Sequence, residues 1–176
     1  MTDTGNLRRV GIFGATFDPP HIAHFVAAGW AQEQLNLEKM LLVPARRNPL
    51  KTDHKPAPPE IRLQMVQAAI AESGSGFEVS DLEICRNDIS YTIDTVRTLR
   101  EKYPPEEWEI FLLMGADTAA DFHRWKNPAE LARICTPAVF NRPGTNLDEV
   151  VSNLPASAVK LRIPNLEISA TMIRER

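Results

Sequence analysis

Short apolar runs recur along the chain, separated by segments that are polar or have helical spacing. The runs are continuous in apolar residues instead of alternating, which is typical of parallel strands covered on both faces. They predict strands at residues 10–13, 40–43, 77–80, 109–114, 138–141 and 158–163. The pattern therefore favours one parallel sheet.

Segments with a helical period lie between these runs. They predict helices that begin at residue 21, cover residues 60–72, 93–103 and 128–135, and begin again near residue 169. In the first of these helices, the large apolar residues recur at helical spacing and are expected to face the core: Ile22, Phe25, Val26, Gly29 and Trp30. Because strands alternate with helices, we expect an α/β fold, a doubly wound parallel sheet with helices on both faces. Its ligand crevice should lie beyond the carboxyl ends of the strands.

Composition and charge exclude several classes of protein. A length of 176 residues, 43% hydrophobic and 24% charged, fits one globular domain. The formal net charge of -3 argues against a protein that coats nucleic acid, and no apolar run is long enough to span a membrane. The polar N-terminus lacks the apolar region of a secretory signal, and Cys85 and Cys135 lack metal-site or disulfide spacing. We expect a cytoplasmic protein with reduced thiols. The sequence does not determine the oligomeric state, and a homo-oligomer is one of the alternatives.

The segment from the first strand to the first helix carries the clearest chemical signal. Gly14 and Ala15 end the strand, where small residues let a nucleotide approach the backbone closely. His21 and His24 lie three residues apart in the first helical turn, so they share a face where unpaired N–H groups attract anions. The segment predicts a phosphate pocket. Neither the dinucleotide-binding glycine spacing nor a P-loop is present, which argues against dehydrogenases and kinases.

Two segments at opposite ends of the chain resemble the motifs of the nucleotidylyltransferase superfamily. Residues 11–24 resemble Gly-x-Phe-Asp-Pro-x-His-x-Gly-His, and residues 168–174 resemble Ile-Ser-Ser-Thr-x-x-Arg. Three internal segments are similar to those of the nicotinate-mononucleotide adenylyltransferases: Ser90 to Thr95, Gly115 to Asp117 with Trp125, and Arg142 to Gly144. The resemblance spans about residues 8–174 and implies a Rossmann-like fold in a single domain, residues 1–176.

The resemblance implies adenylyl transfer from ATP to nicotinate mononucleotide, which gives deamido-NAD and pyrophosphate without a covalent nucleophile on the protein. It makes His21, His24 and Arg174 catalytic through charge stabilisation. It assigns ATP binding to residues of both motifs: Phe13, Gly14, Ala15, Thr16, Asp18, His21, His24, Ile168, Ser169, Thr171 and Arg174. It implies Mg²⁺ bound with ATP, held mostly by phosphate and water. Asp18 precedes a proline and is expected first of all to stabilise a turn.

The resemblance also implies how the acceptor binds. Trp125 stacks on the pyridine ring, and the segment around Thr92 meets its carboxylate. The other expected contacts of the mononucleotide are polar or charged: Asn48, Lys51, Asp117 and Arg142. Asn48 and Lys51 belong to a long proline-rich loop, which we expect to close over the site. Arg46 and Arg47, at its start, are expected to form a solvated charged pair.

Some features depart from the family pattern or leave alternatives open. Ala15 and Ala23 stand where the family has glycine, which adds methyl groups beside the nucleotide. The chain ends two residues after Arg174, so we expect the final helix to be truncated at this point. Pantetheine-phosphate adenylyltransferase, another nucleotidylyltransferase or a non-catalytic nucleotide-binding domain are the alternatives. The sequence leaves open whether the acceptor is the acid or the amide.

Overall fold

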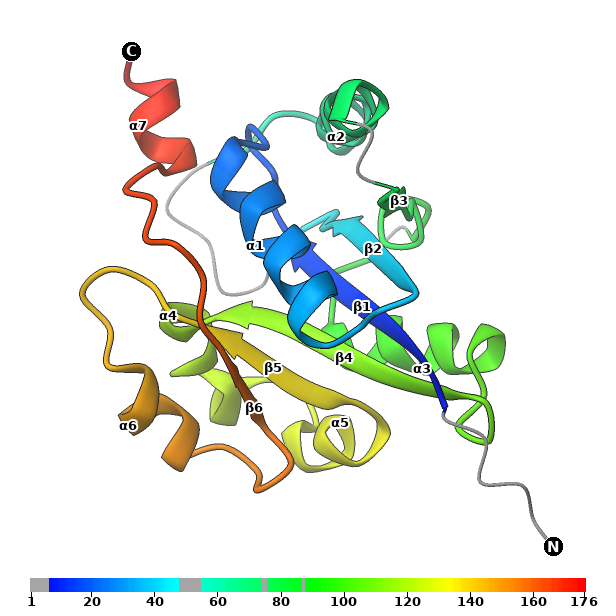
Figure 1. The fold of residues 1–176 in the computed structure, drawn as a ribbon. Coiled ribbons are helices and arrows are strands. Elements are labelled where there is room, and N and C mark those ends of the chain that lie inside the picture. The colour runs from blue at the N-terminus through cyan, green and yellow to red at the C-terminus, as the bar shows by residue number, and fades with distance from the viewer. Residues whose placement is uncertain (1–6, 48–54, 74–75, 87) are drawn as a thin grey trace, which may run out of the picture.

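A computed structural model describes residues 7–47, 55–73, 76–86 and 88–176, and Figure 1 shows one sheet with helices packed around it. The sheet has six parallel strands in the order β3-β2-β1-β4-β5-β6. Their bounds are β1 Arg8–Ala15, β2 Lys39–Pro44, β3 Glu78–Val79, β4 Trp108–Gly115, β5 Thr136–Phe140 and β6 Val159–Leu161. All six predicted strands are present, and the predicted parallel sheet is confirmed.

The helices follow the predicted alternation, with three additional short elements. The longer ones are α1 Ile22–Gln34, α2 Pro59–Ser73, α3 Thr92–Lys102 and α5 Pro128–Ile134, and α7 Ala170–Arg174 is the last. The sequence pattern missed α4 Ala116–Ala119, the 3-10 turn η1 Phe122–Arg124 and α6 Leu147–Ser152. These three elements are too short for a helical period to be visible, because the period needs a window of about 11 or more residues.

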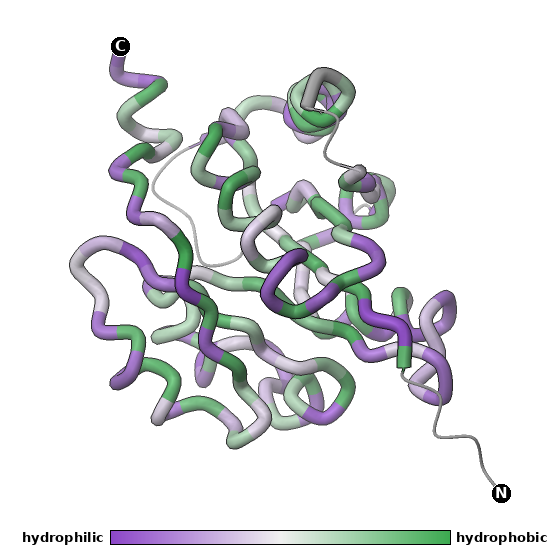
Figure 2. Tube along the Cα trace, viewed as in Figure 1, coloured by the Kyte–Doolittle hydropathy of each residue, from purple (hydrophilic) through white to green (hydrophobic). Residues whose placement is uncertain are grey.

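Each face of the sheet has its own apolar core. On one face, Ile12 of β1 packs with Ile93 and Val96 of α3, together with residues of α4, α5 and α6. On the other face, Leu42 of β2 packs with the alanines of α1 and with Val66 of α2. Figure 2 shows hydrophobic residues concentrated in the sheet, as expected for strands buried on both sides. The prediction of helices on both faces is therefore confirmed.

The predicted core face of α1 is confirmed for Phe25, which packs against the core, and wrong for Ile22 and Trp30. Ile22 is 55% exposed and Trp30 is 43% exposed, whereas small side chains form the buried face: Ala23, Ala27, Ala28 and Ala31. Alanines also recur at helical spacing, so the helix has two regular faces. The sheet takes the face with the smaller side chains, which lets α1 approach the strands closely.

The order of the strands places a crevice between β1 and β4. The chain runs from β1 outward to β2 and β3, and then returns to β4 on the other side of β1. In doubly wound sheets, the connections diverge at such a point and leave a space beyond the carboxyl ends of the strands. Among the described residues, no helix has the length and apolar character needed to cross a bilayer.

The cysteines are both free thiols, as expected. Cys85 is exposed, and Cys135 lies in the core between α5 and β5. Burial raises the pKa of the Cys135 thiol to about 12.

Candidate functional site

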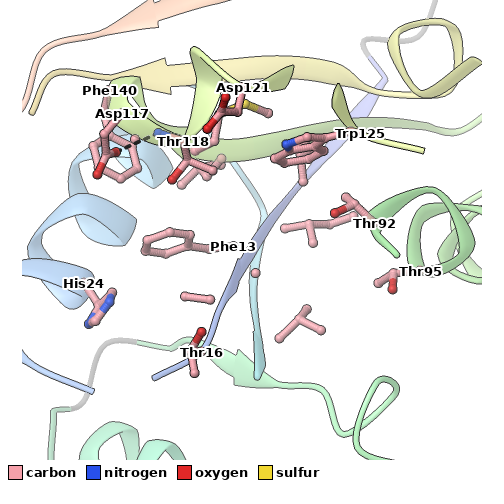
Figure 3. Close-up of a pocket in the computed structure, with 18 of the residues that line it drawn as sticks. Phe13, Thr16, His24, Thr92, Thr95, Asp117, Thr118, Asp121, Trp125 and Phe140 are labelled. Carbon is pink, nitrogen blue, oxygen red and sulfur yellow. Dashed lines mark hydrogen bonds between the residues drawn. The ribbon is translucent and has the colours of Figure 1, made fainter. Parts of the chain in front are cut away.

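A cavity of about 360 Å³ opens at the carboxyl ends of β1 and β4, where the strand order predicts a ligand crevice (Figure 3). It brings together residues that the sequence assigned to ATP and to the mononucleotide. The predicted residues that line it are Phe13, Gly14, Ala15, Thr16, His24, Thr92, Asp117, Trp125 and Arg142. Ala23, where the family has glycine, lines it as well. One cavity therefore joins the strand-to-helix motif to the acceptor side.

The two histidines of the first motif form one unit at the start of α1. His21 immediately precedes the helix, and its backbone N–H donates to Nδ1 of His24 at 3.2 Å. The two rings are stacked with their centroids 3.8 Å apart. Because Nδ1 of His24 accepts this bond, the proton of the neutral ring lies on Nε2. His24 can therefore act as a hydrogen-bond donor toward a ligand without carrying a charge.

The surroundings of His21 disfavour its protonated form. Burial, and after it the positive charge of Arg142, lower the pKa of His21. Both causes favour the neutral imidazole. A bound phosphate would add negative charge at this position and favour the protonated ring instead.

The second motif reaches the loop that precedes His21, although its residues do not line the cavity itself. Arg174 Nη1 donates to the main-chain oxygen of Asp18 at 2.5 Å and lies 3.9 Å from the Asp18 carboxylate. Thr171 Oγ1 accepts from Arg174 Nη2 at 3.2 Å, and Ser169 caps α7 by accepting from the N–H of Met172 at 3.2 Å. Asp18, His21, Ile168, Ser169, Thr171 and Arg174 are not among the residues that line the cavity, and Arg174 connects the second motif to the loop of the first.

The Asp18 carboxylate has a structural contact, but with a segment distant in sequence instead of within its own turn. It is 7% exposed, and its Oδ1 accepts from the N–H of Ala57 at 3.2 Å. The carboxylate therefore connects the loop after β1 to the segment that leads into α2.

On the acceptor side, the ends of β4 and β5 hold an ion pair at the cavity wall. Arg142 Nε lies 3.8 Å from Asp117 Oδ2. A Cβ atom on Gly115 would lie 2.5 Å from Asp117 Oδ1 and 3.0 Å from Arg142 Cγ. Glycine at this position is what allows both charged side chains to pack over the end of the strand. Trp125 follows η1 and packs against Phe122, with ring centroids 5.4 Å apart.

Buried polar atoms without partners gather at this site. In the part of the chain that the structure describes, four buried side-chain N or O atoms have no hydrogen-bond partner: Thr16 Oγ1, His21 Nδ1, Tyr103 Oη and Trp125 Nε1. Thr16 and Trp125 line the cavity, and His21 stacks on a residue that lines it. Buried polar groups in native proteins normally have partners. Three of the four atoms therefore lie at or beside the cavity, where a polar ligand would find hydrogen-bonding groups.

The cavity wall also contains residues that the sequence did not predict. Glu83, Thr95, Thr118, Asp121 and Phe140 also line the cavity. Thr118 and Asp121 could have been found, because they lie at or shortly after the end of the segment Gly115 to Asp117. Thr95 ends the segment Ser90 to Thr95, which resembles the family but gave no role for this residue. Glu83 carries no local signal, since only packing turns it toward the cavity.

The expectations for the loop after β2 have mixed outcomes. Asn48 and Lys51 lie outside the described residues. Arg47 is exposed, but Arg46 is half-buried and its Nη1 donates to the main-chain oxygen of Ile84 at 2.5 Å. The predicted solvated pair is therefore wrong for Arg46, because its guanidinium finds a carbonyl on a neighbouring segment.

Comparisons with known proteins give relatives over nearly the whole chain. The cytidylyltransferase-like family model matches residues 12–176. A nicotinate-nucleotide adenylyltransferase of Thermus thermophilus is 41% identical, covering 96% of this chain and 86% of the relative. One of Herpetosiphon aurantiacus is 37% identical, covering 97% of this chain and 86% of the relative.

Solved structures show the same fold. The structure of Plasmodium falciparum nicotinic acid mononucleotide adenylyltransferase complexed with NaAD has a TM-score of 0.80 at 20% sequence identity, covering 96% of this chain and 83% of that chain. The same enzyme complexed with APC has a TM-score of 0.78 at 19% identity, again covering 96% of this chain and 83% of that chain. With the cavity and both motifs in place, these matches show that the chain belongs to the nicotinate-nucleotide adenylyltransferases of the cytidylyltransferase-like family.

Proposed function

We propose that the protein transfers the adenylyl group of ATP to nicotinate mononucleotide and releases pyrophosphate, which gives deamido-NAD. The observation that carries this proposal is that His24, in the first turn of α1, lines one cavity at the switch point of the sheet together with Asp117 and Trp125 from the segment after β4. The acceptor's 5′-phosphate oxygen forms a bond to the α-phosphorus of ATP as the bond to pyrophosphate breaks. Such a displacement needs positioning and charge stabilisation more than a protein nucleophile.

The histidine pair supplies hydrogen-bond donors to the reacting phosphoryl group. His24 presents a protonated Nε2 because its Nδ1 accepts from the backbone of His21. Donors placed where charge develops typically contribute about 3–4 kcal/mol each to the transition state. His21 and Arg142 are the neighbouring groups that would bind phosphate oxygens.

The second motif is assigned to the leaving group. Ser169 and Thr171 offer hydroxyls, and Arg174 offers a planar guanidinium that suits phosphate oxygens. Arg174 already lies beside the first motif through its bond to Asp18. The adenosine part would lie against Phe13, Gly14, Ala15, Thr16 and Ile168.

The acceptor pyridine stacks on Trp125 in this proposal, and its carboxylate meets the first turn of α3 at Thr92. An electron-poor pyridine favours stacking on an indole. Asp117 would bind ribose hydroxyls, and Asn48 and Lys51 remain predicted anion contacts. Closure of their loop over the site is also a prediction.

The chemistry of the site fits Mg²⁺ that arrives with ATP. The carboxylates of Asp117 and Asp121 line the cavity, and Mg²⁺ prefers oxygen ligands while keeping several waters. When bound, the ion would neutralise charge on the triphosphate. Asp117 would orient the water molecules bound to the ion.

The cytoplasmic location and the homo-oligomer remain predictions.

A pyrophosphate-release assay tests the function. ATP is supplied with nicotinate mononucleotide, nicotinamide mononucleotide or phosphopantetheine in parallel reactions. We expect the highest kcat/KM with nicotinate mononucleotide. A preference for phosphopantetheine would overturn the proposal, and ATP binding without pyrophosphate release would indicate a non-catalytic nucleotide-binding domain.

A further inference from the structure

A buried carboxyl group in the cavity wall has no part in the mechanism described above. Glu83 lies between β3 and α3, is 6% exposed and lines the cavity on the same side as Thr92 and Thr95. Burying a carboxyl group is costly unless its hydrogen bonds are satisfied. The contacts of Glu83 therefore indicate what it holds in place.

The hydroxyl of Thr95 donates to Glu83. Thr95 Oγ1 lies 2.6 Å from Glu83 Oε1 and accepts from Arg86 Nη1 at 3.1 Å. A guanidinium is only a donor, so the hydroxyl proton of Thr95 is available to an acceptor, and Glu83 lies much nearer than the other one, the main-chain oxygen of Tyr91 at 3.5 Å. One side of Glu83 is thus bonded to α3.

Ser90 interacts with Glu83 from the segment before α3. Its Oγ accepts from the backbone N–H of Arg46 at 2.9 Å, and its interaction with Glu83 lowers the pKa of that carboxyl group. Because the oxygen accepts from a backbone donor, its own proton is available to the carboxyl group. Glu83 therefore lies between hydroxyl groups of α3 and of the segment before it.

Together these bonds connect the loop after β2 to the start of α3. Arg46 follows β2, Ser90 precedes α3, and Thr95 lies one turn into that helix. Tyr91 precedes α3, and its side chain makes no capping hydrogen bond. No side chain of the N-cap residue therefore accepts from the backbone N–H groups in the first turn, which begins at Thr92. Figure 3 shows Thr92 and Thr95 on one helix, on the side of the cavity where Trp125 lies.

We propose that Glu83 is a positioning residue that holds the first turn of α3 in place for the acceptor, and so determines the preference for a pyridine carboxylate over a carboxamide. The inference rests on the proposed function, because it takes the acceptor ring to bind between α3 and Trp125. A displaced first turn misaligns N–H donors that bind a carboxylate more strongly than an amide. In the proposed function, ATP would bind against β1 and α1, which are separate from this helix turn.

Stability does not explain why a carboxyl group occupies this position. Burial raises the pKa of Glu83, against the lowering effect of its hydrogen bonds to Thr95 and Ser90 and of the charge of Arg86. When folding raises the pKa of a group, that group adds to the free energy of unfolding at pH values below its pKa in the unfolded chain. This contribution is lost as the pH rises through its pKa in the folded protein. Relative to the unfolded chain, folding therefore disfavours the ionised form of Glu83.

The test compares Glu83→Gln with the wild type in steady-state assays of the full chain. The amide keeps the shape but places an NH₂ group against a hydroxyl donor. We expect the KM for nicotinate mononucleotide to rise about tenfold, the usual scale for one mismatched buried hydrogen bond, and the KM for ATP to change less than about twofold. The kcat/KM ratio of acid to amide acceptor should fall about fivefold or more, and the melting temperature should not fall.

Glu109→Gln is the matched control. Glu109 lies near the amino end of β4 and pairs with Arg9 at 2.8 Å, at the far end of the strand from the cavity. Loss of the Glu109 carboxylate should leave the KM for nicotinate mononucleotide, the KM for ATP and the kcat/KM ratio of acid to amide acceptor unchanged.

The outcomes separate this inference from the proposed function. A wild type that does not turn over nicotinate mononucleotide contradicts the function, whatever the variant does. With an active wild type, an unchanged acceptor KM and ratio in Glu83→Gln would overturn the inference, as would equal rises of both KM values with a lower melting temperature. If Glu83→Gln does not fold, Thr95→Val decides. It removes the hydroxyl donor at nearly constant shape, so a raised acceptor KM supports the inference and a wild-type value refutes it.

Discussion

Arg174 Nη1 donates a hydrogen bond to the main-chain oxygen of Asp18 across 156 positions of sequence. The same nitrogen lies 3.9 Å from the carboxylate of Asp18, which precedes His21 by three residues. The last helix therefore contacts the loop that leads to the two histidines proposed to bind phosphate. Both motifs reach the same end of the sheet, which is the geometric requirement for a shared triphosphate.

Replacing Arg174 with alanine should weaken the use of ATP, because the guanidinium is the cation proposed to bind the leaving phosphates. We expect the KM for ATP to rise about tenfold or more, with a change of less than about twofold for the mononucleotide. Initial rates at varied ATP would measure this. Arg176→Ala, which removes an exposed arginine beyond the same turn, is the control, and an equal effect there would argue against a specific contact.

His24→Ala should reduce turnover far more than ATP binding. Removing a donor aimed at the developing charge should lower kcat by about 10² or more. Single-turnover rates and ATP titration calorimetry separate the two quantities. His123→Ala, at an exposed position outside the cavity wall, should retain wild-type rates. A His24 variant with near-normal kcat would remove His24 from the catalytic group.

The stability of the ligand-free protein should depend on His21 at mildly acidic pH. Its pKa lies below the ordinary value of 6.5 because of burial and the charge of Arg142, so the unfolded chain binds this proton more readily. The stabilising contribution is therefore present above about pH 6.5 and is lost as the pH falls through the folded-state value. Urea unfolding of wild type and His21→Gln between about pH 5 and 7.5 should give a flatter profile for the variant. Parallel profiles would contradict this.

Arg62 should be among the most sensitive positions for stability. It is fully buried, and its guanidinium donates to the main-chain oxygens of Thr16, Ala45, Arg46 and Ala57 at 2.6–3.0 Å. Arg62→Met would leave these carbonyls without that donor. We expect the free energy of unfolding to fall by about 3–5 kcal/mol.

Urea denaturation would measure this loss, and Arg133→Met is the control at an exposed arginine. The control should change stability by less than about 0.5 kcal/mol. A similarly small change for Arg62→Met would mean that water replaces the guanidinium at those carbonyls.

Local patterns in the sequence are sufficient for much of the fold. Continuous apolar runs such as Met40 to Val43 predict buried parallel strands, because a strand covered on both faces needs apolar residues at every position. The histidine pair is equally local, since a separation of three residues in one turn places both rings on one side of a helix.

What the sequence determined by itself was therefore the alternation of strands and helices, the first motif and the expected end of the sheet. Tertiary packing decided the rest. It selected the alanine face of α1 over the larger apolar face, and it turned Glu83 into the cavity wall. It also joined Arg62 to carbonyls from separate segments. The physical reason is that burial and hydrogen-bond partners depend on which segments meet in space, and no window of neighbouring residues contains that information.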